Sequence, residues 1–381
     1  MEQLKKKIRV ALVHDFLTQY GGAERVLEAM TEIFPDAPIY TILYDKDKMR
    51  GKFSDKAIRP SFLQKFPRFL RKRYKYLLPF MPVAPETFDL RDFDLVITSS
   101  GAWSKGIITR LNTIHISYLH SPMRFVWDVS SEYLDQQGKS RAVNFFSRFF
   151  LNYIRSWDKV SSDRPDCLIS NSRYTQERVK KYYRRESRVI YPPVSLRNDF
   201  SNAQAAASHP PRNYFLIVSR LSPYKKIDKA VEAFNKLELP LIVVGEGQQQ
   251  KYLKSIANKN IKFLGWQSDE SLKALYSEAR AFIFPAVDDF GIAPIEAMSY
   301  GVPVLAIRKG GVLETLVEGK TGEYFDSAVP EIIADSVRRF MDNEKKYDRE
   351  YIKQRAGEFS KERFVREFGE YITEKINPKQ F

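Results

Sequence analysis

The segment AFIFPAVDDFGIAPIEAMSYGVPVLA, residues 281–306, sets the fold class of this 381-residue chain. Two short apolar runs, Ala281 to Phe284 and Pro303 to Ala306, are typical of buried strands. The segment between them, about Ala293 to Tyr300, is typical of a helix. A strand, a helix and a strand in this order predict two parallel strands joined by a right-handed crossover.

The same alternation continues along the rest of the chain. Further strands are predicted in the second half at 214–218, 241–244 and 261–264, with helices near 227–237, 248–257 and 270–277. The first half repeats the pattern with strands at 8–13, 95–98, 114–119 and 168–170, and with a helix after Gly21 and Gly22. Short strands alternating with helices predict an α/β chain with parallel sheets covered on both faces, which are doubly wound domains.

The length of the chain favours two domains. Residues 197–211 are small and polar and end in two prolines, so they are predicted to be a linker. We therefore expect one Rossmann-like domain at about 1–195 and a second at about 212–358. A last helix at about 359–381 has Ser360 as its N-cap and an apolar stripe formed by Phe364, Val365, Phe368, Tyr371 and Ile372.

Composition narrows the class of protein. Cys167 is the one cysteine of the chain, so no intramolecular disulfide can form and a reducing, cytoplasmic compartment is expected. The apolar run at 8–13 is too short for a signal peptide or a membrane span, and we expect no transmembrane helix. The net charge is +15, of which residues 1–200 contribute +13. A basic first half suits nucleic acid, anionic lipid or a phosphorylated substrate.

Two carboxylates and two cations follow predicted strands of the second half. Asp288 follows the strand that ends at Phe284, Gly291 lets the backbone approach a ligand, and Glu296 lies in the first turns of the next helix. Carboxylates at this edge of a parallel sheet can bind sugar or ribose hydroxyls. Arg220 and Lys225, in the loop SRLSPYKK, can bind a diphosphate and offset negative charge as it departs.

With these motifs in this order, the chain resembles the retaining family-4 glycosyltransferases. That family has the GT-B fold, in which two Rossmann-like domains face each other across an interdomain cleft. Six further segments match motifs of the family, namely GGAE at 21–24, YLHSPMR at 118–124, SNSRY at 170–174, VVGEG at 243–247, FLGW at 263–266 and GGVLE at 310–314. The HSPMR, IYPPV and SPYKK variants are most similar to the mannosyltransferase branch that uses GDP-mannose.

The resemblance implies a role for each matching residue. Arg220 and Lys225 would bind the donor diphosphate, and Glu296 would bind the ribose. His120 would lie beside the donor sugar and position the reacting hydroxyl. The other donor contacts implied are the backbone of Phe290, Gly291, Ile292 and Ala293 with Asp288 for the sugar, Gly265 and Trp266 near the base, and Gly21 and Gly22 at the diphosphate or the acceptor. Asp288 stands where the family usually has glutamate, a departure that bears on the identity of the donor sugar.

The function implied is transfer of a hexosyl group, mannose from GDP-mannose, to a glycan or a lipid-linked saccharide, with no metal and no cofactor besides the donor. The second domain would bind the donor and the first the acceptor, with the last helix packed back on the first domain. Two alternatives stay open: a nucleotide-sugar epimerase of the same fold, and a basic nucleic-acid-binding protein. The latter is disfavoured because the chain has no recognisable nucleic-acid module.

Two basic segments rich in aromatic residues, at 65–80 and 141–157, allow two interpretations. Each can be a charged helix face over a core. Each can equally contact an anionic membrane surface on the cytoplasmic side, which would suit a lipid-linked acceptor.

Overall fold

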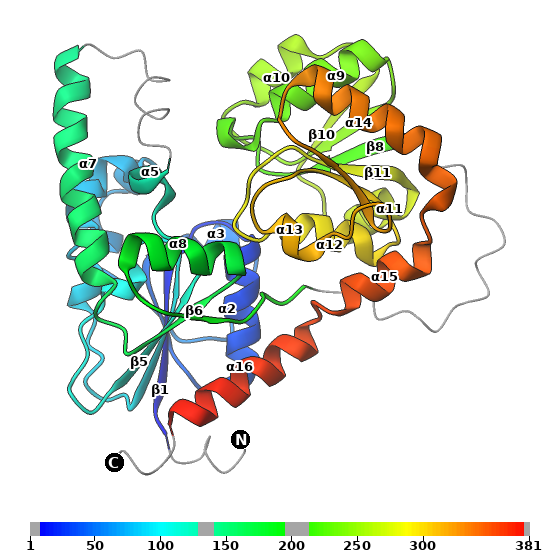
Figure 1. The fold of residues 1–381 in the computed structure, drawn as a ribbon. Coiled ribbons are helices and arrows are strands. Elements are labelled where there is room, and N and C mark those ends of the chain that lie inside the picture. The colour runs from blue at the N-terminus through cyan, green and yellow to red at the C-terminus, as the bar shows by residue number, and fades with distance from the viewer. Residues whose placement is uncertain (1–7, 129–140, 195–212, 377–381) are drawn as a thin grey trace. The chain divides into compact units, whose positions relative to one another are not determined.

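The computed structural model describes residues 8–128, 141–194 and 213–376, so the predicted linker lies outside the described residues. The chain divides into two compact units (Figure 1). Unit 1 comprises Met1–Pro193 together with Phe364–Phe381, and unit 2 comprises Val194–Arg363. Each unit is built around one parallel sheet.

In unit 1 the described strands form a seven-stranded sheet in the order β3-β2-β1-β4-β5-β6-β7. Every neighbouring pair in it is parallel. The strands are β1 (Val10–Leu17), β2 (Ile39–Tyr44), β3 (Ile58–Pro60), β4 (Leu95–Ser100), β5 (Ile114–Leu119), β6 (Cys167–Ser170) and β7 (Arg188–Val189). The chain moves outward from β1 to one edge and then, from β4 on, to the other. The order therefore reverses between β1 and β4, where parallel sheets of this type bind ligands.

The helices of unit 1 are connections between these strands. They are α2 (Gly22–Ile33), α3 (Lys46–Met49), α4 (Arg68–Lys72), α5 (Arg124–Trp127), α7 (Arg141–Ser161) and α8 (Arg173–Tyr183), with 3-10 helices η1 (Phe62–Lys65), η2 (Tyr74–Phe80), η3 (Pro85–Thr87) and η4 (Ser104–Gly106). The basic segment at 65–80 is thus divided among three short helices, with Pro67 between η1 and α4 and Pro79 inside η2.

The C-terminal helix α16 (Lys361–Lys375) completes the core of unit 1. Its Phe364, Phe368 and Ile372 are buried with side chains of α2 and of the central strands, so α2 and α16 cover the same face of the sheet (Figure 1). The backbone N–H of Arg363 donates to Oγ of Ser360 at 3.2 Å, which confirms the predicted N-cap.

In unit 2 the described strands form a six-stranded parallel sheet in the order β10-β9-β8-β11-β12-β13. The strands are β8 (Tyr214–Val218), β9 (Leu241–Val244), β10 (Ile261–Gly265), β11 (Ala279–Phe284), β12 (Val304–Ile307) and β13 (Gly322–Phe325). The helices are α9 (Ile227–Leu237), α10 (Gln250–Ile256), α11 (Asp269–Glu278), α12 (Ile292–Ser299), α13 (Val312–Thr315), α14 (Pro330–Asn343) and α15 (Arg349–Gly357), with the 3-10 helices η6 (Pro223–Lys225) and η7 (Glu344–Lys346). Phe215 of β8 packs edge-on against Phe234 of α9 and Phe340 of α14, which fixes both helices to one face.

The structure differs from the sequence prediction in the extent of several strands. The first strand does not end at Val13 but continues to Leu17, and β2, β3, β7 and β13 were not predicted. β1 can continue because the polar side chains of His14 and Asp15, 2% and 8% exposed, find hydrogen-bond partners inside the fold. Among the described residues, no helix has the length and apolar character required to cross a bilayer.

Candidate active site

The candidate site of unit 2 lies at the carboxyl ends of two neighbouring strands. Lys225 lies in the loop that follows β8, and Asp288 lies in the loop that follows β11. The structure brings these two residues into contact, with Lys225 Nζ 2.5 Å from Oδ2 of Asp288. Their side chains are 14% and 19% exposed, so the pair is partly open to solvent. This edge of a doubly wound sheet is where ligands bind.

Glycines allow the neighbouring loops to pack closely against the loops that carry Lys225 and Asp288. A Cβ at Gly247 would lie 2.2 Å from the carbonyl oxygen of Leu221, and one at Gly311 would lie 2.2 Å from that of Asp289. The N–H of Gly311 also donates to the carbonyl oxygen of Asp288 at 2.9 Å. The glycines of the VVGEG and GGVLE motifs therefore hold the backbone of the loops that carry the charged pair.

The helix α12 begins four residues after Asp288 and carries Glu296. Gly291 precedes the helix with φ +87°, a conformation that favours glycine. Glu296 is partly exposed, and its Oε2 accepts a hydrogen bond from the buried Tyr276 hydroxyl at 3.3 Å. Tyr276 in turn stacks on Tyr300, with ring centroids 5.6 Å apart. The orientation of the Glu296 carboxylate is thus set by a side chain of α11.

The other predicted donor contacts lie on the same edge of the sheet or beside Asp288. Arg220 is exposed on the loop that carries Lys225. Gly265 ends β10 and accepts from the N–H of Gly245 at 2.8 Å, and Trp266, which follows it, is 53% exposed. Phe290 is buried, whereas Gly291, Ile292 and Ala293 are partly exposed.

In unit 1 the predicted residues lie at the carboxyl ends of β1, β4 and β5. His120 follows β5, and its Nε2 lies 2.7 Å from Oγ of Ser99. The same hydroxyl lies 3.0 Å from Nδ1 of His14, which is opposite Ser99 in the register of β1 and β4. Nε2 of His14 is 3.4 Å from Oε1 of Glu24, whose Oε2 accepts from the N–H of Gly21 at 2.8 Å. Gly21 and His120, far apart in sequence, therefore belong to one hydrogen-bonded network.

Two further residues of unit 1 shape this edge of the sheet. Asp15 accepts hydrogen bonds from the four consecutive backbone N–H groups of residues 101–104, at 2.6 to 2.9 Å. Asn171 of the SNSRY motif donates from Nδ2 to the carbonyl oxygen of His120 at 2.9 Å. The sequence prediction missed His14, Asp15 and Ser99, because single polar residues inside apolar strands give no periodic signal.

Burial determines the charge of this network. It lowers the pKa of His120 to about 4, and the nearby His14 acts in the same direction, so His120 is neutral at pH 7. Burial by itself would raise the pKa of Glu24, but the hydrogen bonds from His14 and from backbone N–H groups bring it below its ordinary value. At neutral pH the network therefore contains one carboxylate, Glu24, and a neutral imidazole at His120.

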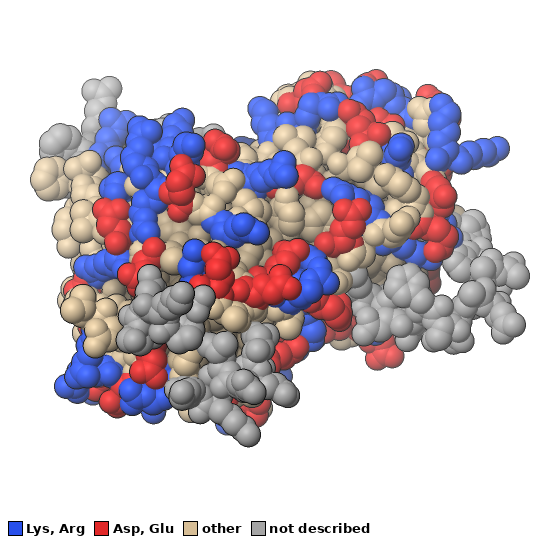
Figure 2. All heavy atoms as spheres, turned by 60° about the horizontal axis from the view of Figure 1, so that its bottom comes forward, with Lys and Arg blue, Asp and Glu red and all other residues tan. Residues whose placement is uncertain are grey.

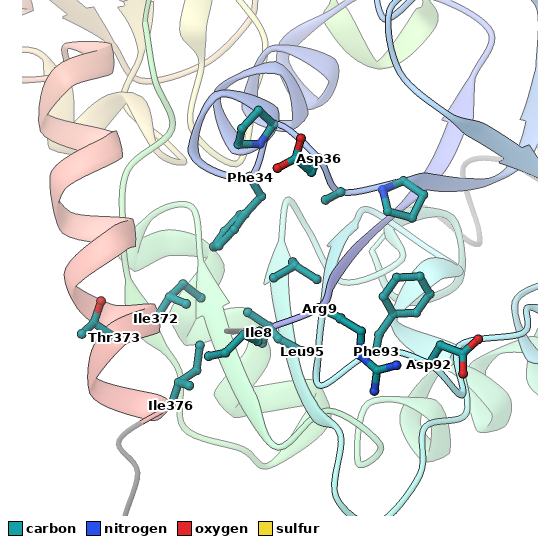
Figure 3. A pocket seen from close by; sticks show the side chains of 14 residues that line it. Ile8, Arg9, Phe34, Asp36, Asp92, Phe93, Leu95, Ile372, Thr373 and Ile376 are labelled. Carbon is teal, nitrogen blue, oxygen red and sulfur yellow. The ribbon is translucent and has the colours of Figure 1, made fainter. Parts of the chain in front are cut away.

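A cavity of about 360 Å³ lies elsewhere in unit 1, beside α16 (Figure 3). Apolar side chains including Phe34, Phe93, Ile372 and Ile376 line most of it. It opens at the amino ends of β1, β2 and β4, the edge opposite His120. Its position on the sheet separates it from the candidate site.

The surface view shows Lys and Arg interspersed with Asp and Glu over the face that it presents (Figure 2). No extended region of a single sign is visible on that face among the residues drawn in colour. The net charge of +15 therefore does not gather into one basic surface there.

The chain is similar to known proteins over nearly its full length. An uncharacterized glycosyltransferase of Methanocaldococcus jannaschii is 20% identical over 93% of both chains. A GDP-mannose-dependent alpha-(1-6)-phosphatidylinositol monomannoside mannosyltransferase of Mycobacterium tuberculosis is 27% identical over 47% of this chain, and the match spans only 53% of that protein. Among solved structures, Anabaena HepE in complex with UDP and glucose superposes with a TM-score of 0.67 at 17% identity, covering 96% of this chain and 99% of the other.

Two family models adjoin along the sequence. The one described as Glycosyltransferase Family 4 matches residues 20–198, and the one described as Glycosyl transferases group 1 matches residues 199–358. The structural similarity and the two parallel sheets confirm the predicted GT-B fold of two Rossmann-like domains. The chain belongs to the family-4 glycosyltransferases.

Proposed function

We propose that this glycosyltransferase moves mannose from GDP-mannose, with retention of anomeric configuration, to a glycan or a lipid-linked saccharide. The observation that carries the proposal is the contact between Lys225 and Asp288 at the start of the loop that leads to Glu296. It combines a cation for a diphosphate with carboxylates for sugar and ribose hydroxyls at one edge of unit 2.

The geometry of the pair suits a diphosphate donor. The Lys225 ammonium has three N–H groups, and Asp288 takes one of them, so the others can bind phosphate oxygens. The Asp288 carboxylate lies beside this ammonium and can accept from a sugar hydroxyl. Arg220, exposed on the same loop, can add a bidentate contact to the diphosphate. Glu296, oriented by Tyr276, binds the ribose hydroxyls in this proposal.

The proposed reaction needs no nucleophile from the protein. The acceptor hydroxyl attacks the anomeric carbon on the face that the diphosphate leaves, and the departing diphosphate takes the hydroxyl proton. Lys225 and Arg220 stabilise the negative charge that develops on the leaving group, and the exposed N–H groups at the start of α12 contribute in the same sense. No metal takes part in the proposed step.

The donor base and sugar are the finer part of the proposal. The GDP-mannose-dependent mycobacterial relative supports GDP-mannose, whereas the UDP bound to HepE represents the competing choice. A thermal-shift series with GDP, GDP-mannose, UDP and UDP-glucose distinguishes them. A ligand at one hundred times its Kd stabilises the protein by about 2.7 kcal/mol, which is a shift of several degrees. Stabilisation by UDP-glucose but not by GDP-mannose would refute the donor assignment.

A product assay tests the reaction class in the same preparation. With GDP-mannose and saccharide acceptors, transfer predicts GDP release that depends on the acceptor. Conversion of the donor sugar without any acceptor would indicate an epimerase instead. Tight, salt-sensitive binding of DNA or RNA would indicate a nucleic-acid-binding protein.

We also propose that unit 1 contacts an anionic membrane surface to reach a lipid-linked acceptor. Large hydrophobic side chains are exposed next to basic ones in both segments: Phe69 is 66% and Phe149 75% exposed, beside Arg68 and Arg148. Basic and aromatic side chains together favour binding at an anionic interface. Flotation with vesicles rich in anionic lipid should recover the protein at low salt, and absence from the floated fraction at low salt would end this proposal.

A further inference from the structure

A chain of hydrogen bonds in unit 1 connects a carboxylate to the proposed substrate-side histidine. It runs from Glu24 on α2, through His14 on β1 and Ser99 on β4, to His120 after β5. Glu24, His14 and Ser99 are 6%, 2% and 1% exposed, so the chain is shielded from water except at its His120 end. Of these four residues, the family resemblance gives a role to His120 alone.

The positions of the protons in this chain follow from its first member. A carboxylate can only accept, so His14 donates from Nε2 to Glu24. When His14 carries only that proton, its Nδ1 accepts, and the donor is the Ser99 hydroxyl. Because the Ser99 hydroxyl donates its hydrogen bond to His14, its oxygen accepts from Nε2–H of His120. The remaining nitrogen of His120, Nδ1, consequently carries a lone pair.

The surroundings leave this order of donors undisturbed. The second oxygen of Glu24 is held by the N–H of Gly21, and Asp15 is occupied by the four N–H groups of residues 101–104. The aromatic neighbours of His120, Tyr118 and His14, meet its ring edge-on at centroid distances of 5.3 and 6.4 Å. Within the described residues, Nδ1 of His120 has no hydrogen-bond partner, and the side chain is half-buried.

We propose that His14 carries a single proton and that Glu24, His14 and Ser99 are positioning residues that hold His120 as the Nε2–H tautomer, so that Nδ1 accepts a hydrogen bond from the acceptor hydroxyl as it docks, before the proton passes to the departing diphosphate. This inference rests on the proposed transfer reaction. A hydroxyl that donates to Nδ1 keeps its oxygen lone pairs for the anomeric carbon. In the opposite tautomer, Nδ1–H of His120 would donate to the acceptor hydroxyl and occupy a lone pair of its oxygen, which the attack on the anomeric carbon requires.

The substitution Glu24→Gln reverses the direction of donation along these hydrogen bonds, while the side chain keeps its size and shape. The Gln amide oxygen takes the N–H of Gly21, which turns the NH₂ group toward Nε2 of His14. His14 must then donate from Nδ1 to Ser99, and the Ser99 hydroxyl donates to Nε2 of His120. His120 therefore becomes the Nδ1–H tautomer, and an isosteric substitution three hydrogen bonds away alters the proposed substrate contact.

Long-range ¹⁵N–¹H correlation spectra of the full chain labelled at histidine test this prediction. The chain has four histidines, so single His→Gln variants assign each ring. The wild type is expected to show Nε2–H for His120, and Glu24→Gln to show Nδ1–H. Ser99→Ala removes the hydroxyl that joins His14 to His120, so it should abolish the preference of His120 for one tautomer. Adding Glu24→Gln to Ser99→Ala should then leave the tautomers of His120 unchanged. Glu28→Gln, on the same helix but bound to Lys52 and Tyr20, should leave the tautomer unchanged.

Transfer kinetics provide the second readout. Glu24→Gln is expected to lower kcat about 10- to 100-fold, because the hydrogen bond that positions the acceptor hydroxyl is lost, with little change in KM for the donor. Nδ1–H in the wild-type His120, or an unchanged tautomer in Glu24→Gln, would overturn the inference. If Glu24→Gln does not fold, Ser99→Ala decides through the tautomer signal. If the tautomers behave as expected but the wild type transfers no sugar, the proposed function is refuted, while the control of the His120 tautomer by Glu24, His14 and Ser99 is confirmed.

Discussion

Unit 1 and unit 2 each contain a lysine–aspartate pair with an N–O distance of 2.5 Å, and the two pairs have opposite surroundings. Lys105 and Asp158 of unit 1 are 1% and 0% exposed. Lys225 and Asp288 of unit 2 are 14% and 19% exposed. The distance alone therefore says nothing about function, and the remaining contacts of each pair decide what it can do.

Both members of the buried pair make further hydrogen bonds. Asp158 also accepts from Trp127 Nε1 at 2.7 Å and from the Tyr183 hydroxyl at 2.8 Å. Lys105 also donates to the carbonyl oxygen of Ala102. These contacts tie η4, α5, α7 and α8 together and leave no room for a ligand. In the open pair, Lys225 keeps N–H groups available, which binding of a diphosphate requires.

The largest expected effect comes from breaking the buried pair with Lys105→Met. Removing one partner leaves Asp158 charged in the core of unit 1, which costs about 3–5 kcal/mol of unfolding free energy. Urea unfolding followed by tryptophan fluorescence measures it. Lys159→Met, on the same helix as Asp158 but in an exposed pair with Asp163, should change stability by less than about 1 kcal/mol. Equal losses in both variants would contradict the comparison.

The open pair should show the reverse pattern in Lys225→Met. We expect transfer to fall about 10²–10³-fold, because a cation that stabilises the leaving diphosphate is removed. Unfolding free energy should change by less than about 1 kcal/mol, since Asp288 can reach water. Initial rates and urea unfolding of one preparation give both numbers. The control is Lys229→Met, because Lys229 and its partners Glu232 and Asp228 all lie on α9, outside the proposed site. Full activity of Lys225→Met would remove Lys225 from the site.

A buried histidine of unit 1 extends the comparison. His115 is fully buried, and burial lowers its pKa to about 3. The unfolded chain takes up a proton there below about pH 6.5 and the folded one does not, so His115 lowers stability as the pH falls. Relative to pH 7, the loss at pH 4 is about 3 kcal/mol. His115→Gln should flatten urea-derived stability between pH 7 and pH 4, and parallel profiles for variant and wild type would contradict this assignment.

How much the sequence could predict differs between the two units for a physical reason. In unit 2, Arg220 with Lys225 and Asp288 with Glu296 lie in two contiguous motifs, each directly after an apolar run, so the local pattern reveals them. In unit 1 the network takes His14, Ser99 and His120 from the ends of three strands. Their contact depends on strand register, which no local pattern encodes. The same limit explains β13, a four-residue strand whose partner β12 decides its existence.

The smallest expected effect concerns Glu296. It is partly exposed, as the Lys225–Asp288 pair is, but one of its oxygens accepts a hydrogen bond from Tyr276. Glu296→Gln keeps an oxygen to accept from Tyr276 but replaces charged contacts to ribose hydroxyls by neutral ones, which are about half as strong. We expect donor KM to rise about tenfold, or about 1.4 kcal/mol, with kcat nearly unchanged. Glu278→Gln, exposed at the end of α11, serves as the control. A change in kcat without a change in KM would mean that Glu296 acts on the reacting centre instead, and the division of roles between Glu296 and the Lys225–Asp288 pair would have to be reversed.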